Sequence, residues 1–258
     1  MATPRPTDTK SLLARLDGAA AYPLTLRARS MITDVLAEVE LDGDLDSLRS
    51  LPGNDVMLAV PVDGGDGSFR RRYTVRRSTE TSLTLWIDVT AAGPGATWAR
   101  SAPIGSTIEA IGPRGQVTLD PLADWHLFIG DLSFLSAAYA MAEAIEPPGQ
   151  ALFVLQVDDE AHLITPTLDE AVGVTLCVIE RAGWGPSDPI GLLSGLRALE
   201  LPDDEGVAYV GGELSVVAAV RAALLERGFT ADAIRSKPYW RLGVSNLAHG
   251  EPKKDDLA

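Results

Sequence analysis

Five arginines lie within the nine positions of FRRRYTVRR, residues 69–77, in a 258-residue chain whose formal net charge is −14. Guanidinium groups form paired hydrogen bonds with phosphate and carboxylate oxygens, so this segment could bind an anion. Strand alternation would place Arg71, Tyr73 and Val75 on one face. The opposite face would carry Arg70, Arg72, Thr74 and Arg76. Charge on both faces fits poorly in a core, and we therefore predict an edge strand that presents an anion site.

Two later segments, FIGDLSFLSAA (128–138) and YVGGELSVVAA (209–219), could also bind an anion. Each places Gly, an acid and Ser where a predicted strand passes into a predicted helix. Amides at a helix N-terminus are free, and the helix dipole favours negative charge there. The alternative is that Ser133 and Ser215 are simple N-caps. Neither junction has the full G-x-G-x-x-G pattern, so the standard dinucleotide-binding fold of that type is not predicted.

The composition limits the partners of these sites. The sequence pI is about 4.6, whereas nucleic acids are bound through clustered Lys and Arg, so nucleic acid is not predicted as a partner. A local basic cluster in an acidic chain indicates a small anion instead. The histidines lie far apart without a partner at metal-ligand spacing, and no metal site is predicted. They are His126, His162 and His249.

We expect a cytoplasmic protein. No uninterrupted apolar run approaches the roughly 20 residues of a membrane span. The N-terminal stretch MATPRPTDTKSLLARL lacks the apolar core of a secretory signal and carries acids that disfavour a transit peptide. The single cysteine, Cys177, excludes an internal disulfide, and its apolar surroundings VGVTLCVIE predict a buried structural thiol.

Two kinds of element must position these residues. From Tyr22 to about Leu119, short β-rich segments alternate with turn sequences such as LPGND, VDGGDG and AAGPGAT. This pattern is typical of an antiparallel barrel. The predicted strands cover residues 22–29, 32–40, 55–62, 69–77, 82–90, 105–111 and 115–119.

From Trp125 onward, predicted strands alternate with helices, which indicates a parallel sheet with helices on its faces. Strands are predicted at 125–130, 151–157, 172–180, 207–212 and 238–243, and helices at 133–146, 188–200 and 213–228. The predicted fold class is thus α/β with two domains, a barrel at 22–121 and an α/β domain at 122–247. The terminal segments 1–21 and 248–258 are expected to have frayed ends.

Six motifs resemble, in order and approximate spacing, those of the siderophore-interacting proteins, flavin-dependent ferric-siderophore reductases of the ferredoxin-reductase superfamily. They are RRYTVRR, GPGATWA, PIGSTIEAIGPRGQ, DWHLFIGD, YVGGELSVVAAVRAALLERGF and KPYWRLG. The resemblance covers about residues 25 to 243. R-x-Y-[ST] at 71–74 is typical of the wider superfamily of flavin barrels, whereas DWHLFIGD with the final YWRLG is more specific to this family.

The resemblance implies that the arginine strand lies along FAD, in a barrel that serves as the FAD-binding domain. Arg71 would pair with the pyrophosphate, and Tyr73 would pack on the isoalloxazine ring. The contacts implied for this strand are made by Arg71, Tyr73, Thr74, Val75 and Arg76. The alternative is a solvated edge strand whose charges prevent aggregation. That role is assigned to the remaining arginines, Arg70 and Arg77.

The segment GPGATWAR, 93–100, aligns with the second flavin segment of the family. There, glycines let backbone amides approach the pyrophosphate and a small hydroxyl residue assists. Ala96 stands where Ser or Thr is usual, so Thr97 could substitute. Thr90 stands where the family usually has a histidine, and it keeps a hydrogen bond but cannot titrate near neutral pH. The residues implied to line FAD here are Thr90, Gly93, Gly95, Ala96 and Thr97.

The α/β domain resembles the NAD(P)H-binding domain of the family, with changes. The family pattern G-D-E-[ST], followed by an apolar residue or two and Pro, reads GDLSFLSAA here. Leu132 replaces the usual acid and Ser136 the usual proline, which leaves the use of a nicotinamide cofactor open. The residues implied to bind the nucleotide are Asp131, Ser133, Gly212 and Glu213.

The C-terminal KPYWRLG matches the basic and aromatic end of the family, which lies over the flavin and beside the substrate cleft. The resemblance implies that Trp240 contacts FAD. The residues implied to bind an anionic ferric siderophore in the cleft between the domains are Lys237, Arg241 and Arg114. The alternative is that Tyr239 and Trp240 are core aromatics and that Lys237 is a solvated lysine.

The resemblance therefore implies reduction of ferric siderophores through FAD, with electrons from NAD(P)H or a ferredoxin and release of ferrous iron. No catalytic acid or base is implied, because the flavin carries the chemistry. One alternative is a non-catalytic relative that binds flavin or siderophore as a carrier or partner module, which Leu132 and Thr90 favour. Another is an NAD(P)H flavin reductase with a different acceptor. We expect a monomer.

Overall fold

The computed structural model describes residues 20–61, 67–90, 93–115 and 117–244. The chain divides into two compact units between Thr118 and Leu119. The predictions of frayed ends at 1–10 and 249–258, and the position of His249, fall outside the described residues.

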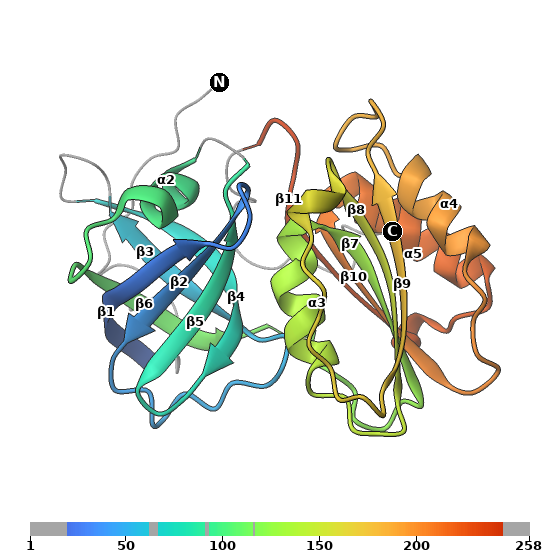
Figure 1. Cartoon of the computed structure of the whole chain (residues 1–258), viewed down its shortest axis with the longest axis horizontal. Coiled ribbons are helices and arrows are strands. Elements are labelled where there is room, and N and C mark those ends of the chain that lie inside the picture. Colours follow the sequence, from blue (N-terminus) through green and yellow to red (C-terminus); the bar gives the residue numbers. More distant parts are fainter. Residues whose placement is uncertain (1–19, 62–66, 91–92, 116, 245–258) are drawn as a thin grey trace. The chain divides into compact units, whose positions relative to one another are not determined.

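The unit before Leu119 is a closed antiparallel barrel with the strand order β1-β2-β5-β4-β3-β6 (Figure 1). Its elements are β1 (Ala20–Met31), β2 (Leu36–Asp42), β3 (Asp55–Pro61), β4 (Ser68–Ser78), β5 (Ser82–Asp88), α2 (Pro94–Ser101) and β6 (Thr107–Arg114). Alternation along β1 buries Tyr22, Leu24 and Leu26 in the core and leaves the residues between them exposed. The predicted antiparallel barrel is confirmed.

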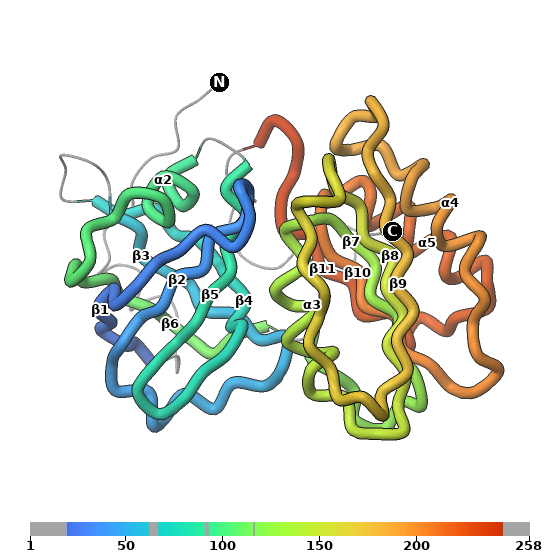
Figure 2. The backbone as a smooth tube through the Cα atoms, viewed as in Figure 1, coloured from blue at the N-terminus to red at the C-terminus, as the bar shows by residue number. Residues whose placement is uncertain are grey.

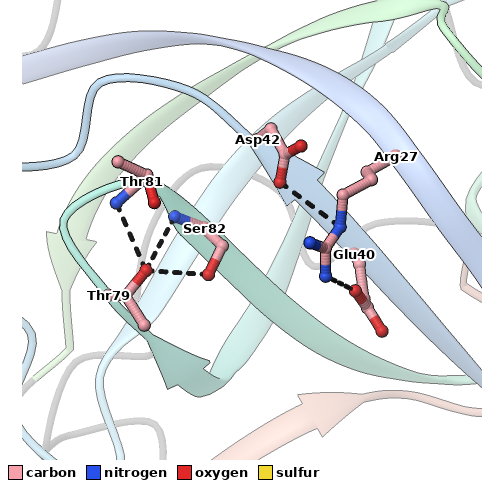
Figure 3. Close-up of polar contacts among 6 residues, drawn as sticks. All are labelled: Arg27, Glu40, Asp42, Thr79, Thr81 and Ser82. Atoms are coloured by element: carbon pink, nitrogen blue, oxygen red, sulfur yellow. Dashed lines mark hydrogen bonds and ion pairs between the residues drawn. The ribbon is translucent and has the colours of Figure 1, made fainter.

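Polar contacts on the barrel surface join neighbouring strands. Arg27 of β1 forms ion pairs with two acids of β2, Glu40 and Asp42 (Figure 3). In the turn between β4 and β5, the Thr79 hydroxyl accepts hydrogen bonds of 3.2 and 3.0 Å from the amides of Thr81 and Ser82. Exposed ion pairs contribute about 1 kcal/mol or less each, so the barrel is stabilised mainly by its apolar core.

The edge position predicted for the arginine strand is wrong, because β4 is one of the strands of the closed barrel wall and pairs on both sides, with β3 and with β5. It pairs with β3 from Ser68 to Thr74 and with β5 from Val75 onward. The register of the second pairing shifts between Val75 and Arg77, so that Arg76 is an extra residue in the strand. This irregularity breaks the predicted alternation, and Val75 and Arg76 are both buried while Arg77 is exposed.

Three local predictions in the barrel are also corrected. Part of the predicted turn AAGPGAT opens helix α2, which buries Trp98 and Ala99 in the barrel core. The described residues of the predicted strand 115–119 form no strand, and β2 begins at Leu36 rather than at residue 32.

The described residues from Leu119 onward form a parallel five-stranded sheet in the order β11-β10-β7-β8-β9, which confirms the predicted α/β architecture. Its elements are β7 (Trp125–Asp131), α3 (Leu135–Ala142), β8 (Gln150–Val157), β9 (Gly173–Glu180), α4 (Ile190–Ala198), β10 (Gly206–Glu213), α5 (Leu214–Glu226) and β11 (Ile234–Trp240). The final strand thus starts four residues before the predicted one. Among the described helices, none has both the length and the apolarity that a membrane crossing requires.

The two faces of this sheet are packed differently. Helices α4 and α5 cover one face of the sheet and α3 covers the other (Figure 1). Apolar side chains pack against α4 and α5, whereas aromatic side chains occupy the face toward α3. The ring of Phe128 stacks on Phe153 and on Tyr209 with centroid distances of 5.1 Å, and Tyr139 of α3 meets Phe153 edge-on. Burial on both faces explains why β7 and β8 are nearly continuous apolar runs.

Strand β9 lies at one edge of the sheet, and the chain between β8 and β9 runs as a loop with one short turn at Glu160–His162 (Figure 2). Val174 and Leu176 are therefore exposed. Cys177 is half-buried rather than fully buried as predicted, because an edge strand lacks a neighbour on one side.

A polar cluster ties the first residues of this unit to the sheet. The amide of Asp120 donates a hydrogen bond of 2.8 Å to the hydroxyl of Tyr209, and the carboxylate of Asp120 pairs with Arg235 of β11. His126 Nδ1 lies 3.4 Å from the same hydroxyl. Burial lowers the pKa of His126 to about 4, so its imidazole is neutral at neutral pH.

Candidate functional site

Arg71 and Tyr73 of β4 lie directly against the first turn of α2. A methyl group added to Gly95 would lie 1.9 Å from the Tyr73 hydroxyl and 3.4 Å from Cγ of Arg71. Only a glycine allows this approach without displacing the tyrosine. Burial raises the pKa of Tyr73 well above its usual range, so the hydroxyl stays protonated and able to donate a hydrogen bond.

The guanidinium of Arg71 is partly withdrawn from water. Its Nη1 donates a hydrogen bond of 2.8 Å to the backbone oxygen of Arg70, and its Cζ lies 5.6 Å from the centre of the Phe69 ring. Burial lowers the pKa of Arg71, although an arginine remains charged at any physiological pH. A partly desolvated cation of this kind is stabilised by an anion that binds beside it.

The N-terminus of α2 supplies a second feature that attracts an anion. Its N-cap is Gly93, which has no side chain to cap the helix, and Pro94 has no N–H. The first helical hydrogen bond runs from the Thr97 amide to the Gly93 oxygen, so the amides of Gly95 and Ala96 precede it. No acid stands in the first turn. A phosphate next to Arg71 could therefore accept hydrogen bonds from these amides and interact favourably with the helix dipole.

The two junctions of the other unit are capped differently. The carboxylate of Asp131 accepts hydrogen bonds from the amide of Ser133 at 3.0 Å and from the amide of Glu213 at 3.2 Å. The carboxylate of Glu213 accepts from the amides of Ser215 (2.6 Å) and Val216 (3.2 Å), and hydrogen bonds lower its pKa although burial opposes this. The capping residues are thus the acids Asp131 and Glu213, not Ser133 or Ser215 as in the alternative prediction. Their carboxylates accept hydrogen bonds from amides that could otherwise have donated to a phosphate.

Glycines at the ends of β7 and β10 make room for side chains of this chain. A methyl group on Gly130 or Gly211 would lie within 2.7 or 2.3 Å of the fully buried Phe134 ring. A methyl group on Gly212, whose φ is +137°, would lie 2.7 Å from the Asp131 carboxylate. Intramolecular packing therefore accounts for these glycines. Leu132, at the position of the usual acid, is 8% exposed and packs as an apolar residue.

The other residues assigned to β4 and its neighbourhood have partners of their own. The Arg76 guanidinium lies 4.2 Å from the centre of the Trp86 ring, and Trp86 Nε1 donates to Glu38 at 2.8 Å. Thr74 and Val75 are buried. Thr90 donates hydrogen bonds from its amide and its hydroxyl to one carboxylate oxygen, Oδ1 of Asp88.

The residues assigned to the C-terminal segment lie on and after β11. Lys237 Nζ is 5.6 Å from the centre of the Tyr239 ring, which lies near Phe134. Trp240 Nε1 donates a hydrogen bond of 3.0 Å to Asp131, and Arg241 is exposed. Arg114 is half-buried and belongs to the other unit, at the end of β6. Among the described residues, no group of three or more His, Cys, Asp or Glu side chains could hold a metal ion.

One feature of the barrel unit was not predicted from the sequence. A pocket of about 400 Å³ lies beside α2, with Phe69 and Thr97 among its lining residues. Phe69 alternates with Arg71 and Tyr73 along β4, so the same two-residue spacing could have placed it on the candidate site. The helical form of residues 94–101 was needed to see the pocket itself.

Comparisons with known proteins identify the family of this chain. A family model described as the siderophore-interacting FAD-binding domain matches residues 50–117, and one described as siderophore-interacting protein matches residues 123–243. The ferric vibriobactin reductase ViuB of Vibrio cholerae is 32% identical over 212 residues, covering 76% of each chain. An uncharacterized protein of Mycobacterium tuberculosis is 34% identical over 202 residues, covering 72% of this chain and 69% of that protein.

Solved structures with the same fold include a siderophore utilization protein from T. fusca, with a TM-score of 0.78, 28% identity and coverage of 91% of this chain and 98% of that one. The siderophore-interacting protein from Acinetobacter baumannii gives a TM-score of 0.75 at 20% identity, covering 89% and 93%. The ferredoxin reductase of carbazole 1,9a-dioxygenase gives 0.71 at 21% identity, covering 85% and 69%. The last two likenesses concern the fold alone.

Proposed function

Since this chain belongs to the siderophore-interacting protein family, we propose that it is an FAD-dependent reductase of ferric siderophores that releases ferrous iron. The relative ViuB is named a ferric vibriobactin reductase, and this name supports reduction as the activity. Residues 22–121 would serve as the FAD-binding domain and residues 122–247 as the NAD(P)H-binding-like domain. The reaction takes place in the cytoplasm, where NAD(P)H and ferredoxins are available, and the protein acts as a monomer.

The observation that carries the proposal is the meeting of Arg71 with the uncapped N-terminus of α2. The barrel residues fit FAD because the Arg71 side chain passes the first turn of α2, whose amides have no side-chain cap, and a cation with helix amides can hold a pyrophosphate. Arg71 binds its oxygens, and the amides of Gly95 and Ala96 donate to it. Tyr73 and the strand through Thr74 and Val75 orient the isoalloxazine ring. FAD held there would supply the one-electron redox chemistry that reduction of ferric iron requires.

The donor is NAD(P)H or a ferredoxin. The carboxylates of Asp131 and Glu213 accept hydrogen bonds from amides at the strand ends. The ring of Phe134 fills the space next to Gly130 and Gly211. These features disfavour a pyrophosphate at that edge, since a carboxylate repels it. They also support one alternative, a flavin- or siderophore-binding relative that does not react with NAD(P)H.

The function is tested by anaerobic spectroscopy of the purified protein loaded with FAD. NADH, NADPH or a reduced ferredoxin is added and bleaching of the flavin is followed; a ferric tris-catecholate complex is then added with a ferrous-specific chelator. We expect bleaching by at least one donor, followed by recovery of the flavin band and appearance of ferrous iron. Bleaching that only other acceptors reverse would instead identify a flavin reductase, and no bleaching by any donor would identify the carrier.

Lys237→Ala is expected to weaken an anionic ferric siderophore about five- to ten-fold, as for one charge-assisted contact, and to leave flavin reduction intact. The overall charge of −14 repels such a ligand, so a local cation must reverse the sign at short range. Fluorescence quenching by the ferric siderophore at low and high salt measures the effect, which should shrink as salt rises. Lys237→Arg, which keeps the charge, is the control; equal affinity of all three proteins at low salt would contradict the assignment.

A further inference from the structure

Strand β9 (Gly173–Glu180) forms one edge of the five-stranded sheet, and β8 is its only neighbour among the described strands. Among the backbone hydrogen bonds that join other described segments, none involves residues 174–180. The strand is eight residues long and contains no proline or lysine. Its outer N–H and C=O groups are therefore a template to which another extended chain can add.

The side chains of β9 alternate between a covered face and an open one. Cys177 and Ile179 pack against the apolar cluster that includes residues of α4 and α5. Val174 and Leu176 belong to the opposite face and are 49% and 39% exposed. That face is open because the chain from β8 to β9 contains only one short turn, at Glu160–His162, where a crossover helix usually lies. A strand added at this edge would cover part of both apolar side chains.

Acidic side chains stand at both ends of this edge. Asp169 and Glu170 are exposed shortly before β9 begins, and Glu180 is exposed at its last residue. Glu180 lies next to Glu160, whose amide donates a hydrogen bond of 3.2 Å to the Glu180 carboxylate. From residue 158 to residue 180 the sequence has six acids and no lysine or arginine. A strand that adds here must therefore carry cations near both of its ends.

The same acids disfavour a second copy of this chain as the added strand. Two copies of an edge strand related by a two-fold axis pair antiparallel, so the start of β9 in one copy would meet the end of β9 in the other. Asp169 and Glu170 would then lie close to Glu180 of the second copy, and like charges placed opposite each other are destabilising. The next residue after β9, Arg181, already pairs with Asp158. The acids therefore oppose self-association and leave the edge open to a basic strand.

We propose that β9 is a docking edge for an extended basic segment of another protein, which adds to the sheet as a sixth strand. Main-chain hydrogen bonds to β9 supply affinity, and apolar residues at alternate positions of the segment cover Val174 and Leu176. Lysines or arginines separated by about the eight residues of β9 meet the acids at the two ends. The docking edge uses none of the residues assigned to FAD, NAD(P)H or the siderophore, so it goes beyond the proposed function.

The probe is a fluorescein-labelled peptide, KKVTVTVTVTKK, whose alternating core matches the length of β9 and whose lysines can reach the acids at both ends. We expect its fluorescence anisotropy to rise on titration with the full chain at low salt, and the affinity to fall as salt rises. The peptide EEVTVTVTVTEE, with the same core, should bind about ten-fold more weakly or worse. Equal affinity of the two peptides, or no binding of either up to millimolar protein, would overturn the proposal.

Surface variants separate docking at β9 from general attraction of a cation to an acidic chain. Leu176→Lys places a cation on the open face of β9 and should weaken the basic peptide about ten-fold. Leu122→Lys, at a side chain that is 90% exposed in the same unit, makes the same change of charge elsewhere and should leave the affinity nearly unchanged. Equal weakening by the two variants would contradict docking at this edge.

Hydrogen exchange of the wild-type chain keeps the test decisive if Leu176→Lys does not fold. An added strand accepts hydrogen bonds from the outward amides of β9, so the basic peptide should slow exchange within residues 174–180. The amides of the barrel unit should exchange as before. Protection that appears only outside β9 would overturn the proposal.

Discussion

Arg71→Ala is expected to weaken FAD binding about 10- to 100-fold while the barrel remains folded. The Arg71 side chain passes the first turn of α2, with Cγ 3.4 Å from the position of a methyl group on Gly95, and loss of hydrogen bonds to a charged group costs roughly 1.5 to 3 kcal/mol. The alanine should not damage the core, because the arginine is only partly buried. Titration of flavin-free protein with FAD, together with the melting temperature, measures both effects.

Neighbouring arginines of the same strand provide controls. Arg77→Ala removes an exposed guanidinium and should change neither affinity nor stability appreciably. Arg72→Ala should instead lower stability, because Arg72 forms two hydrogen bonds of 2.8 and 2.7 Å to the carboxylate of Asp55, which is 3% exposed. If all three variants lost FAD equally, general disruption of the strand would explain the result and the pyrophosphate assignment would be wrong.

The free energy of unfolding is expected to fall as pH drops from 6.5 toward 4, with His126 contributing at most about 1.4 kcal/mol per pH unit. The ring is neutral in the folded protein because burial lowers its pKa to about 4, whereas the unfolded chain takes up the proton near pH 6.5. In this window the unfolded state binds more protons, so acid favours unfolding.

Urea unfolding of the protein and of His126→Phe at pH 4.5, 5.5, 6.5 and 7.5 isolates the histidine from the carboxylates. Phenylalanine suits the site because His126 stacks on Phe128 and Tyr209, with centroid distances of 6.4 and 6.0 Å. The variant loses the contact with the Tyr209 hydroxyl, which lowers its stability at neutral pH. Its stability should nevertheless fall less steeply toward acid than that of the wild type. Parallel curves for the two proteins would show that His126 is not held neutral by the fold.

The sequence by itself determined the two-domain architecture and the arginine strand. Strand alternation in the barrel and continuous apolar runs in β7 and β8 are local patterns, because they follow from which faces of a strand are buried. Arg71 and Tyr73 could be placed on one face of a strand for the same reason. The motifs in their order then indicated the family that the comparisons support.

Only the tertiary structure decided that β4 has neighbours on both sides. Closure of the barrel depends on β1 pairing with β2 and also with β6, more than 70 residues away at every paired position. No local pattern contains such a pairing. The helical form of 94–101 was hidden in a similar way, since Pro94 and Gly95 resemble a turn and the stabilising burial of Trp98 comes from distant strands.

The tertiary structure also decided what the glycines and acids do. A glycine marks a place where space is needed, but the sequence does not say whether a ligand or a side chain fills that space. Gly95 makes room for Tyr73, whereas Gly130 and Gly211 make room for Phe134. Asp131 and Glu213 likewise accept hydrogen bonds from nearby amides, so these amides are not available to donate to a phosphate. The resemblance already placed the pyrophosphate at residues 93–97. The folded chain shows in addition that these residues open a helix with no side-chain cap and no acid in its first turn, because capping depends on the positions of atoms and not on residue types alone.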